Sequence, residues 1–377
     1  MPTTLPAEAR IVRKAAGGAM MREIPAFLVE RVTKIRDPRP EWRDQAREHL
    51  NSLTKPLGSL GRLESIAEQL VSIFGGSIPR SLNKAAYIFA ADHGVCAEGI
   101  SLYPSQVTAQ MVHNFARGGA AINVLCRLHD CALTVVDAGV NADLTSLTEI
   151  EHRKVRRGSR NLAKEPAMTD AELSAALHAG AKIADLASLR NQHLVAVGEM
   201  GIGNTTAASA ITALLTGQSA LEVTGTGTGL DEASRMRKAE VIQHAIETHF
   251  GAVDLPCSPV AILQCVGGLE IAAMTGFYLA AAAHGVALVC DGFISTAAAA
   301  IAASVEPRII HSLFAGHQSE EPGHQWLLKK LELKPILQLQ MRLGEGSGGV
   351  LAMPVIESAA AVYREMATFS SAAVSEA

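Results

Sequence analysis

One segment of the chain, GEMGIGNTT, has the composition of a phosphate-binding turn. It joins a glycine-rich turn to residues that commonly begin a helix. The candidate phosphate-binding residues are Gly201, Ile202, Gly203, Asn204 and Thr205. The first turn of a helix leaves backbone N–H groups unpaired, and together with the helix dipole these groups attract anions. This segment by itself is also compatible with a plain turn.

A second segment, TGTGTGLDEAS, has the same form, with Gly225 and Gly227 ahead of a predicted helix. It lacks the Lys-Ser/Thr pair of a Walker loop, and neither segment has the full fingerprint of a dinucleotide-binding unit. Lys238 stands two turns into the second predicted helix. Two such turns together with this lysine favour a phosphate site, and they suit a mononucleotide better than NAD.

A third glycine-rich segment, RLGEGSGG, surrounds a single acid, Glu345. The glycines around it are Gly344, Gly346, Gly348 and Gly349. Glycine loses more backbone entropy on folding than any other residue, so this density needs a steric reason. Either the backbone adopts positive φ angles there, or a group other than a side chain comes close to it. A tight connection with an incidental, solvated glutamate is the alternative.

The elements that must position these segments follow a repeated pattern. Short, continuous apolar runs end in a polar residue and glycine, and a helical segment follows. The runs are residues 85–94, 132–139, 194–203, 286–292 and 312–318. Continuous apolar strands separated by helices, such as 170–189 and 231–250, indicate a parallel sheet covered on both faces. The sequence therefore predicts an α/β fold with a doubly wound, mainly parallel, Rossmann-like sheet.

The ends of the predicted strands carry acids and imidazoles, and ligands of such sheets bind beyond the carboxyl ends of the strands. The residues at these ends are Asp92, His93, Asp137, Glu199, Asp291 and His317. No three of them have the spacing of metal ligands, so we expect no metal. Glu199 directly precedes the first glycine turn, where it is either a site residue or a capping or solvated carboxylate.

The stretch AEGISLYPSQVTAQMVHNF follows the first predicted strand. It offers apolar walls and a few polar groups, among them Ser101, Tyr103, Gln110 and Met111. Such a mixture suits a flat aromatic ligand. In the alternative interpretation these residues belong to the core or cap the helix that begins near Pro104.

Composition and charge limit the classes of function. The 377 residues carry a formal net charge of −4, which gives no electrostatic case for binding nucleic acid or an anionic membrane. The six cysteines show no CxxC motif, so a reducing cytoplasm fits them best. Residues 1–25 lack the apolar core of a signal peptide and are expected to be a flexible extension. Residues 271–290 have the length of a membrane span, but His284 and Gly285 divide them, which predicts a buried helix and a buried strand.

Seven motifs resemble, in this order, those of the nicotinate-nucleotide–dimethylbenzimidazole phosphoribosyltransferase family. They are KPLGSLGRLE, ADHGV, GEMGIGNTT, TGTGTGLDEAS, DGFISTAAA, GHQSEEPGH and RLGEGSGG. The resemblance extends from about Lys55 to about Ala360. It implies a large α/β domain over residues 81–334 and a small helical domain built from residues 26–80 and 335–377. It also implies a homodimer, small-molecule substrates and no cofactor.

The resemblance further implies a reaction and a set of roles. Ribose 5-phosphate would move from nicotinate mononucleotide to dimethylbenzimidazole or a similar azole, for the lower ligand of cobalamin. Glu345 would be the general base that removes the azole proton, and Glu199 would lie beside the reacting centre. The two glycine turns, Lys238 and Asp291 would hold the nucleotide. The residues expected to border the azole are Ser101, Tyr103, Gln110, Met111 and Leu343.

The chain departs from the family pattern in two places. Family members often have a basic residue at the position of Thr226, so the resemblance implies that one contact to the phosphate or to a partner is missing here. Residues 1–25 have no family counterpart. Two alternatives exist on the same fold: a nucleotide-dependent oxidoreductase, which would need a full glycine fingerprint, and a non-catalytic nucleotide-binding protein. The sequence does not select among benzimidazole, dimethylbenzimidazole, adenine and phenolic acceptors.

Overall fold

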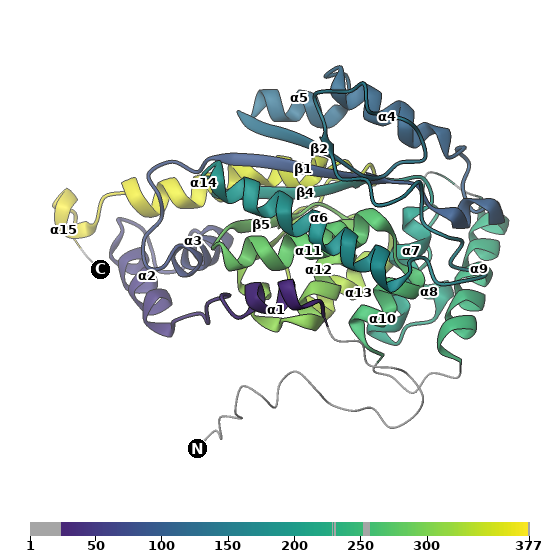
Figure 1. Ribbon diagram of the computed structural model, residues 1–377. Coiled ribbons are helices and arrows are strands. Elements are labelled where there is room, and N and C mark those ends of the chain that lie inside the picture. Colours follow the sequence, from purple (N-terminus) through teal and green to yellow (C-terminus); the bar gives the residue numbers. More distant parts are fainter. Residues whose placement is uncertain (1–23, 228, 230, 252–256, 376–377) are drawn as a thin grey trace.

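A seven-stranded parallel sheet lies at the centre of the computed structural model, which describes residues 24–227, 229, 231–251 and 257–375 (Figure 1). The strands are β1 Lys84–Ala91, β2 Cys131–Gly139, β3 Glu151–His152, β4 Leu194–Met200, β5 Ala287–Cys290, β6 Leu313–His317 and β7 Pro335–Leu337. Their order is β3-β2-β1-β4-β5-β6-β7, and every neighbouring pair is parallel. The order reverses between β1 and β4, as it does in Rossmann folds. The predicted doubly wound, mainly parallel α/β sheet is confirmed.

Five strands lie in the apolar runs that predicted them, whereas β3 and β7 were not predicted. These two strands have two and three residues, too few for a sequence pattern, and pairing with β2 and β6 defines them. Strand β7 also extends the sheet into the segment 335–377, which was expected to be helical. The predicted boundary at residue 335 therefore falls at the first residue of a strand.

Helices cover both faces of the sheet, and Figure 1 shows α4 and α5 on one side of β1 and β2 and α11 and α12 on the other. One layer contains α1 Ala26–Val32, α6 Asp170–Leu189, α7 Asn204–Thr216, α8 Ala220–Val223, α9 Glu232–Phe250, α10 Pro259–Val266, α11 Leu269–Ala283, α12 Phe293–Val305 and α13 Pro322–Leu331. The other contains α2 Pro40–Ser52, α3 Arg62–Ile73, α4 Gln106–Ala116, α5 Ala121–Leu128 and α14 Ser347–Glu365. The remaining short elements are η2 Gly94–Glu98, η3 Pro307–Ser312 and α15 Phe369–Ala372.

Strand β1 shows why the apolar runs are continuous. Tyr87 and Phe89 pack against Phe277 of α11 in the first layer. Their neighbour Ile88 belongs to the core of the second layer. Because successive side chains of a strand point to opposite faces, a sheet covered on both sides needs apolar residues at every position.

The helical predictions agree closely with the structure. Helix α6 begins and ends where it was predicted, at Asp170 and Leu189, and a capping box closed by Thr169 and Glu172 fixes its start. The segment 271–290 divides into most of α11 and the strand β5, as expected. Among the helices that the structure describes, none combines the length and the hydrophobicity of a membrane span.

Helices from both chain ends lie side by side. Helix α3 packs on α2 and on α14, and Leu53 forms an antiparallel bridge with Thr368. Because α14 also packs on β4, β5 and β6, this group shares one core with the sheet. Helix α1 packs instead on α11, in the opposite layer. We propose that α2, α3 and α14 form a helical subdomain. The segment 1–25, which was expected to be a flexible extension, lies almost wholly outside the residues that the structure describes.

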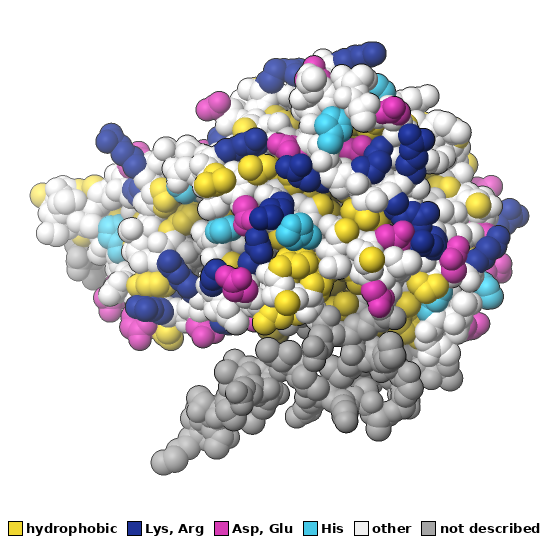
Figure 2. Space-filling model, in the orientation of Figure 1, with side chains coloured by type: hydrophobic (Ala, Val, Ile, Leu, Met, Phe, Trp, Pro, Cys, Tyr) yellow, Lys and Arg dark blue, Asp and Glu magenta, His cyan; other side chains and the backbone are white. Residues whose placement is uncertain are grey.

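The surface carries charges of both signs. On the face that Figure 2 shows, Lys and Arg side chains are interspersed with Asp and Glu side chains. This distribution agrees with the small net charge of −4.

Candidate active site

A cavity of about 200 Å³ lies beyond the carboxyl ends of β4, β5 and β6. It is the position that the doubly wound topology predicts for a ligand. Residues from all three glycine-rich segments meet there. The predicted site residues that line it are Tyr103, Met111, Glu199, Gly201, Ile202, Asn204, Thr205, Gly227, Asp291, Leu343 and Glu345.

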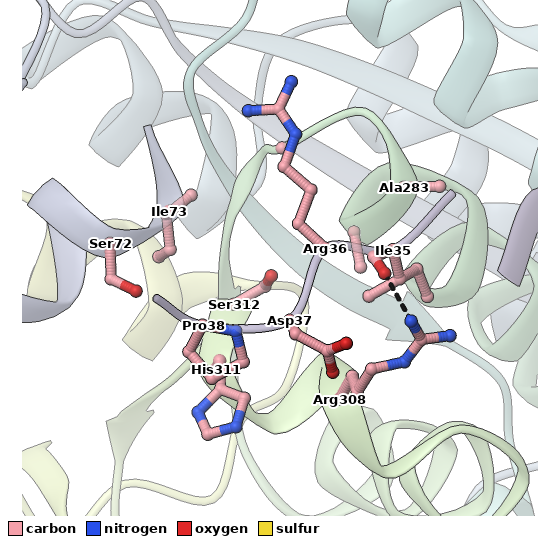
Figure 3. A pocket seen from close by; sticks show the side chains of 12 residues that line it. Ile35, Arg36, Asp37, Pro38, Ser72, Ile73, Ala283, Arg308, His311 and Ser312 are labelled. Atoms are coloured by element: carbon pink, nitrogen blue, oxygen red, sulfur yellow. Dashed lines mark hydrogen bonds between the residues drawn. The ribbon is translucent and has the colours of Figure 1, made fainter. Parts of the chain in front are cut away.

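A pocket of about 30 Å³ at the amino ends of β5 and β6 has a structural role (Figure 3). Arg308 donates hydrogen bonds to the carbonyl oxygens of Ile35 (2.7 Å) and Val32 (2.9 Å), and it also pairs with Glu306. Arg36 extends away from this pocket in Figure 3. The arginine at position 308 thus ties the end of α1 to η3, and the space beside it is large enough for about one water molecule.

A recess of about 40 Å³ adjoins the main cavity and has the features of an anion site. Gly201, Asn204, Thr205 and Gly227 line both spaces. Gly203 lines the recess but not the main cavity. Asn204 is the first residue of α7, so the N-terminus of that helix, the positive end of its dipole, lies here. A phosphate in the recess would meet both the helix N-terminus and the backbone of the glycine turns.

Lys238 supplies the positive charge of the recess. Its side chain is 1% exposed, and its Nζ donates a hydrogen bond to Thr205 Oγ1 at 2.8 Å. Burial lowers the pKa of Lys238 to about 8, although the nearby carboxylate of Glu321 opposes this change. At pH 7 the ammonium is therefore largely charged, and a bound phosphate would stabilise that charge.

The backbone around Glu345 explains the glycines beside it. Gly344, Glu345 and Gly346 have φ angles of 81°, 61° and 74°, so three consecutive residues adopt the left-handed conformation just before α14. A Cβ atom at Gly344 would collide with Glu199, and one at Gly346 would meet Ile88 at 2.8 Å. The glutamate is the one member of this turn that lacks glycine's freedom, and such strained residues cluster at functional sites.

The environment of Glu345 prepares it to accept a proton near neutral pH. Burial raises the pKa of Glu345 to about 7; the backbone N–H of Ile122 opposes this change and the charge of Asp291 adds to it. Within the described residues, Glu345 Oε2 has no hydrogen-bond partner. The carboxyl group therefore borders the cavity with an unused acceptor.

Glu199 lies at the end of β4, where neighbouring acids act on its carboxyl group. Burial raises the pKa of Glu199 well above its usual value, and the charges of Asp291 and Glu270 raise it further. Asn204 Nδ2 donates a hydrogen bond to Glu199 Oε2. Its surroundings therefore favour the protonated form of Glu199, while Glu345 titrates near neutral pH.

Asp291 was predicted to hold the nucleotide, but its carboxylate has other partners. The backbone N–H groups of Gly346 and Gly349 donate to it at 3.1 and 2.9 Å. Burial nevertheless raises the pKa of Asp291. These bonds fasten the turn that carries Glu345 to the end of β5, so Asp291 borders the cavity as a positioning residue. Its contact with a nucleotide remains a prediction.

The predicted azole-binding residues are only partly brought together. Tyr103, Val107 and Met111 line the cavity, since positions four apart lie on one face of a helix, and α4 includes two of them. Gln110 is exposed on α4 and lines neither the cavity nor the recess. Ser101 lines the recess instead of the main cavity.

Several lining residues were not predicted. Among them are Phe293, Ser319, Glu321 and Arg342, and His317 was noted at a strand end without a role. Arg342 Nη1 donates to the carbonyl oxygen of Gly227 at 2.9 Å, which joins two glycine-rich segments. The motif GHQSEEPGH, directly after a predicted strand, was the available signal for Ser319 and Glu321. The predicted Gly225 does not line the cavity; it lies against Glu321 and Pro322.

No group of three or more His, Cys, Asp or Glu residues in the described part of the chain is arranged to hold a metal ion. The cavity offers several carboxyl groups and adjoins an anion seat. A Rossmann-like sheet that carries such a site at its carboxyl edge defines a nucleotide-binding α/β enzyme.

The class becomes specific through comparison with known proteins. A family model described as phosphoribosyltransferase matches residues 35–374. A nicotinate-nucleotide–dimethylbenzimidazole phosphoribosyltransferase from Desulforudis audaxviator is 47% identical over 88% of this chain and 93% of the relative. One from Chloroflexus aggregans is 48% identical over the same shares. The crystal structure of CobT from Thermus thermophilus has a TM-score of 0.85 and 45% identity, and covers 90% of this chain and 100% of that one. The chain belongs to the nicotinate-nucleotide–dimethylbenzimidazole phosphoribosyltransferase family, as its motifs indicated.

Proposed function

We propose that this protein transfers ribose 5-phosphate from nicotinate mononucleotide to 5,6-dimethylbenzimidazole or a similar azole. The products are nicotinate and the α-ribazole 5′-phosphate needed for the lower ligand of cobalamin. One observation carries the proposal: a buried carboxyl group, Glu345, with a pKa of about 7 lines a cavity that adjoins an anion seat containing Lys238. The names of the relatives support it.

The recess fixes the donor at its phosphate. Lys238 and the N-terminus of α7 hold the anion, and Gly201 and Gly227 border both spaces. The ribose and the nicotinate then extend into the main cavity. Holding the donor in this way converts an encounter between two molecules into an oriented reaction.

The acceptor enters between apolar walls that include Met111 and Leu343. One azole nitrogen attacks the anomeric carbon, with inversion, while the other nitrogen gives its proton to Glu345. The C–N bond of the pyridinium nucleotide breaks, and its electron pair leaves with nicotinate, whose ring nitrogen becomes neutral. One general base therefore suffices for the proton balance, because the leaving group needs no proton.

Glu199 supports this chemistry through its neutral carboxyl group. Like charges in a shared site prevent each other from ionising, so a protonated Glu199 leaves Glu345 free to carry the negative charge. Glu199 also lies against Gly344, in the same turn as the base. We propose that it orients the turn and the reacting centre.

Two further features belong to the proposal. We infer a homodimer, on the strength of the family resemblance, and light scattering on the purified protein would show its mass. We also infer a cytoplasmic location, because all six cysteines are free thiols, which suits a reducing compartment.

The reaction is tested with the purified protein, nicotinate mononucleotide and dimethylbenzimidazole. We expect equal amounts of nicotinate and α-ribazole 5′-phosphate, separated by chromatography. Release of nicotinate without azole consumption would indicate a hydrolase, and binding of the nucleotide without either product would indicate a binding protein. An oxidoreductase would instead require a nicotinamide dinucleotide, for which the glycine turns lack the fingerprint.

A further inference from the structure

Glu321 is a buried acid of the cavity to which the proposed reaction gives no role. It is 5% exposed, lies between β6 and α13, and lines the cavity. Among the described residues, its Oε2 atom has no hydrogen-bond partner. A buried carboxylate oxygen without a partner is costly, so a site that keeps one is completed by a ligand that donates a hydrogen bond.

The position of Glu321 identifies the part of the ligand that it would meet. Its Oε2 atom lies against Gly225, in a space that any side chain at that position would fill. Two residues further along the same turn, Gly227 borders Lys238 and Thr205 in the anion recess. Glu321 thus stands beside the phosphate seat, on the side of the main cavity. In a nucleotide, the group next to the phosphate is the ribose.

The surroundings of Glu321 hold it in place. The backbone N–H of Glu321 donates to Ser319 Oγ at 3.3 Å, and the N–H of Ser319 donates to His324 Nδ1 at 2.9 Å. Because His324 Nδ1 accepts this bond, Nε2 carries the proton of the neutral ring and donates to Thr296 Oγ1 at 3.0 Å. Burial lowers the pKa of His324 to about 3, which keeps the ring neutral. The acid therefore sits on a turn that is ordered before a ligand arrives.

We propose that Glu321 accepts hydrogen bonds from the ribose hydroxyl groups of the donor and so restricts the enzyme to ribonucleotides. The inference rests on the proposed transfer of ribose 5-phosphate. Hydroxyl groups are donors, and a carboxylate is an acceptor only, so the pair is complementary. In glycosyl transfer the anomeric carbon becomes cationic, and hydrogen bonds to the 2-hydroxyl group strengthen as it does so. Glu321 then contributes to turnover as well as to binding.

A second role for Glu321 is as a counter-charge for Lys238, since its charge acts on that lysine. The two roles differ in their dependence on the sugar. A counter-charge affects every donor that carries a phosphate, whereas a ribose contact affects only donors that have the hydroxyl group.

The test compares nicotinate mononucleotide with its 2′-deoxy and 3′-deoxy analogues for wild type, Glu321→Gln and Glu321→Ala. We expect Glu321→Ala to lower kcat/KM for the ribonucleotide by about 10²-fold relative to wild type. For at least one deoxy analogue, the same variant should change kcat/KM by less than about threefold. Glu321→Gln should have a kcat/KM for the ribonucleotide between those of wild type and Glu321→Ala. Comparing variants cancels the intrinsic reactivity of each donor. Glu320→Gln is the matched control, because Glu320 is the exposed acid next in sequence and lines neither space.

Equal losses for all three donors would overturn the proposal and assign Glu321 to Lys238 or to the fold. Calorimetric titration with the three donors, without azole, keeps the test independent of turnover. We expect wild type to bind the ribonucleotide more tightly than a deoxy analogue, and Glu321→Ala to remove that difference in affinity. This result would support the ribose contact even if the expected reaction products did not form. If the preference persists in Glu321→Ala, the proposal is wrong.

Discussion

At the scale of single residues, the site depends on two carboxyl groups that burial affects to different extents. Glu345 has a pKa of about 7, whereas the pKa of Glu199 lies well above its usual value. A base is most effective when its pKa is close to the working pH, since it is then both ionised and able to take a proton. The environment, rather than the residue type, separates the two roles.

The first prediction is a bell-shaped dependence of kcat/KM on pH. Activity should rise as Glu345 ionises through about pH 7 and fall as Lys238 loses its charge above about pH 8. The profile of kcat/KM reports the free enzyme. In the profile of kcat, the descending limb should move to higher pH, because bound phosphate stabilises the ammonium.

Lys238→Arg is the matched variant for this profile, since arginine stays charged throughout this range and should remove the descending limb alone. As a control for ionisation of the acceptor, the ascending limb is compared with the titration of the free azole, which is measured by absorbance. A rate that is flat between about pH 6 and 9 would contradict both assignments.

The second prediction concerns the anion seat. Lys238→Ala should weaken the binding of nicotinate mononucleotide by about 10- to 10²-fold, the effect of losing a charge-assisted hydrogen bond. The affinity for dimethylbenzimidazole should change little, because only the nucleotide carries the anion. Calorimetry with each ligand separates the two, and an equal loss for both would show damage to the fold instead.

At the scale of elements, the turn before α14 acts as a unit that Asp291 fastens to β5. Its carboxylate accepts hydrogen bonds from Gly346 and Gly349, on either side of the first turn of α14. The docking of one helix start on one strand end thereby sets the place of Glu345. The sequence shows Asp291 at a strand end but not its partners, which lie more than fifty residues away in the chain.

The third prediction tests this fastening through Asp291→Asn. The amide offers one acceptor oxygen for two N–H groups, so we expect kcat to fall by about tenfold or more with a small change in KM for the nucleotide. The charge of Asp291 raises the pKa of Glu345, so its loss should also move the ascending limb of the pH profile to lower pH. A purely structural role would lower kcat and leave the position of that limb unchanged. Melting temperature serves as the control for folding.

Elements with a strong local pattern were the ones the sequence could predict. Helix α6 has caps and twenty regular residues, so its local sequence suffices to place it. Strands β3 and β7 exist through pairing with distant segments, and the helical face that excludes Gln110 from the cavity depends on how α4 docks. Glu321 could not be assigned for the same reason, since its burial results from the packing of the TGTGTG turn against α13.

At the scale of the whole molecule, the sheet brings together segments that are far apart in the chain. The strand order places the carboxyl ends of β4, β5 and β6 in a row, and the turn before α14, from the far end of the chain, supplies the proposed base. The fold was predictable because its strands are continuous apolar runs. The family followed from motifs that cover these same strand ends, and the comparisons confirm it.

The measurement that tests the central claim most directly is the turnover of Glu345→Gln with both substrates saturating. Glutamine keeps the size of the side chain but cannot take the azole proton at neutral pH. We predict that kcat falls by about 10²–10⁴-fold, while the melting temperature and the affinity for nicotinate mononucleotide stay close to those of wild type and of the Glu320→Gln control. A kcat within a few-fold of wild type in a folded variant would contradict the assignment of Glu345 as the base.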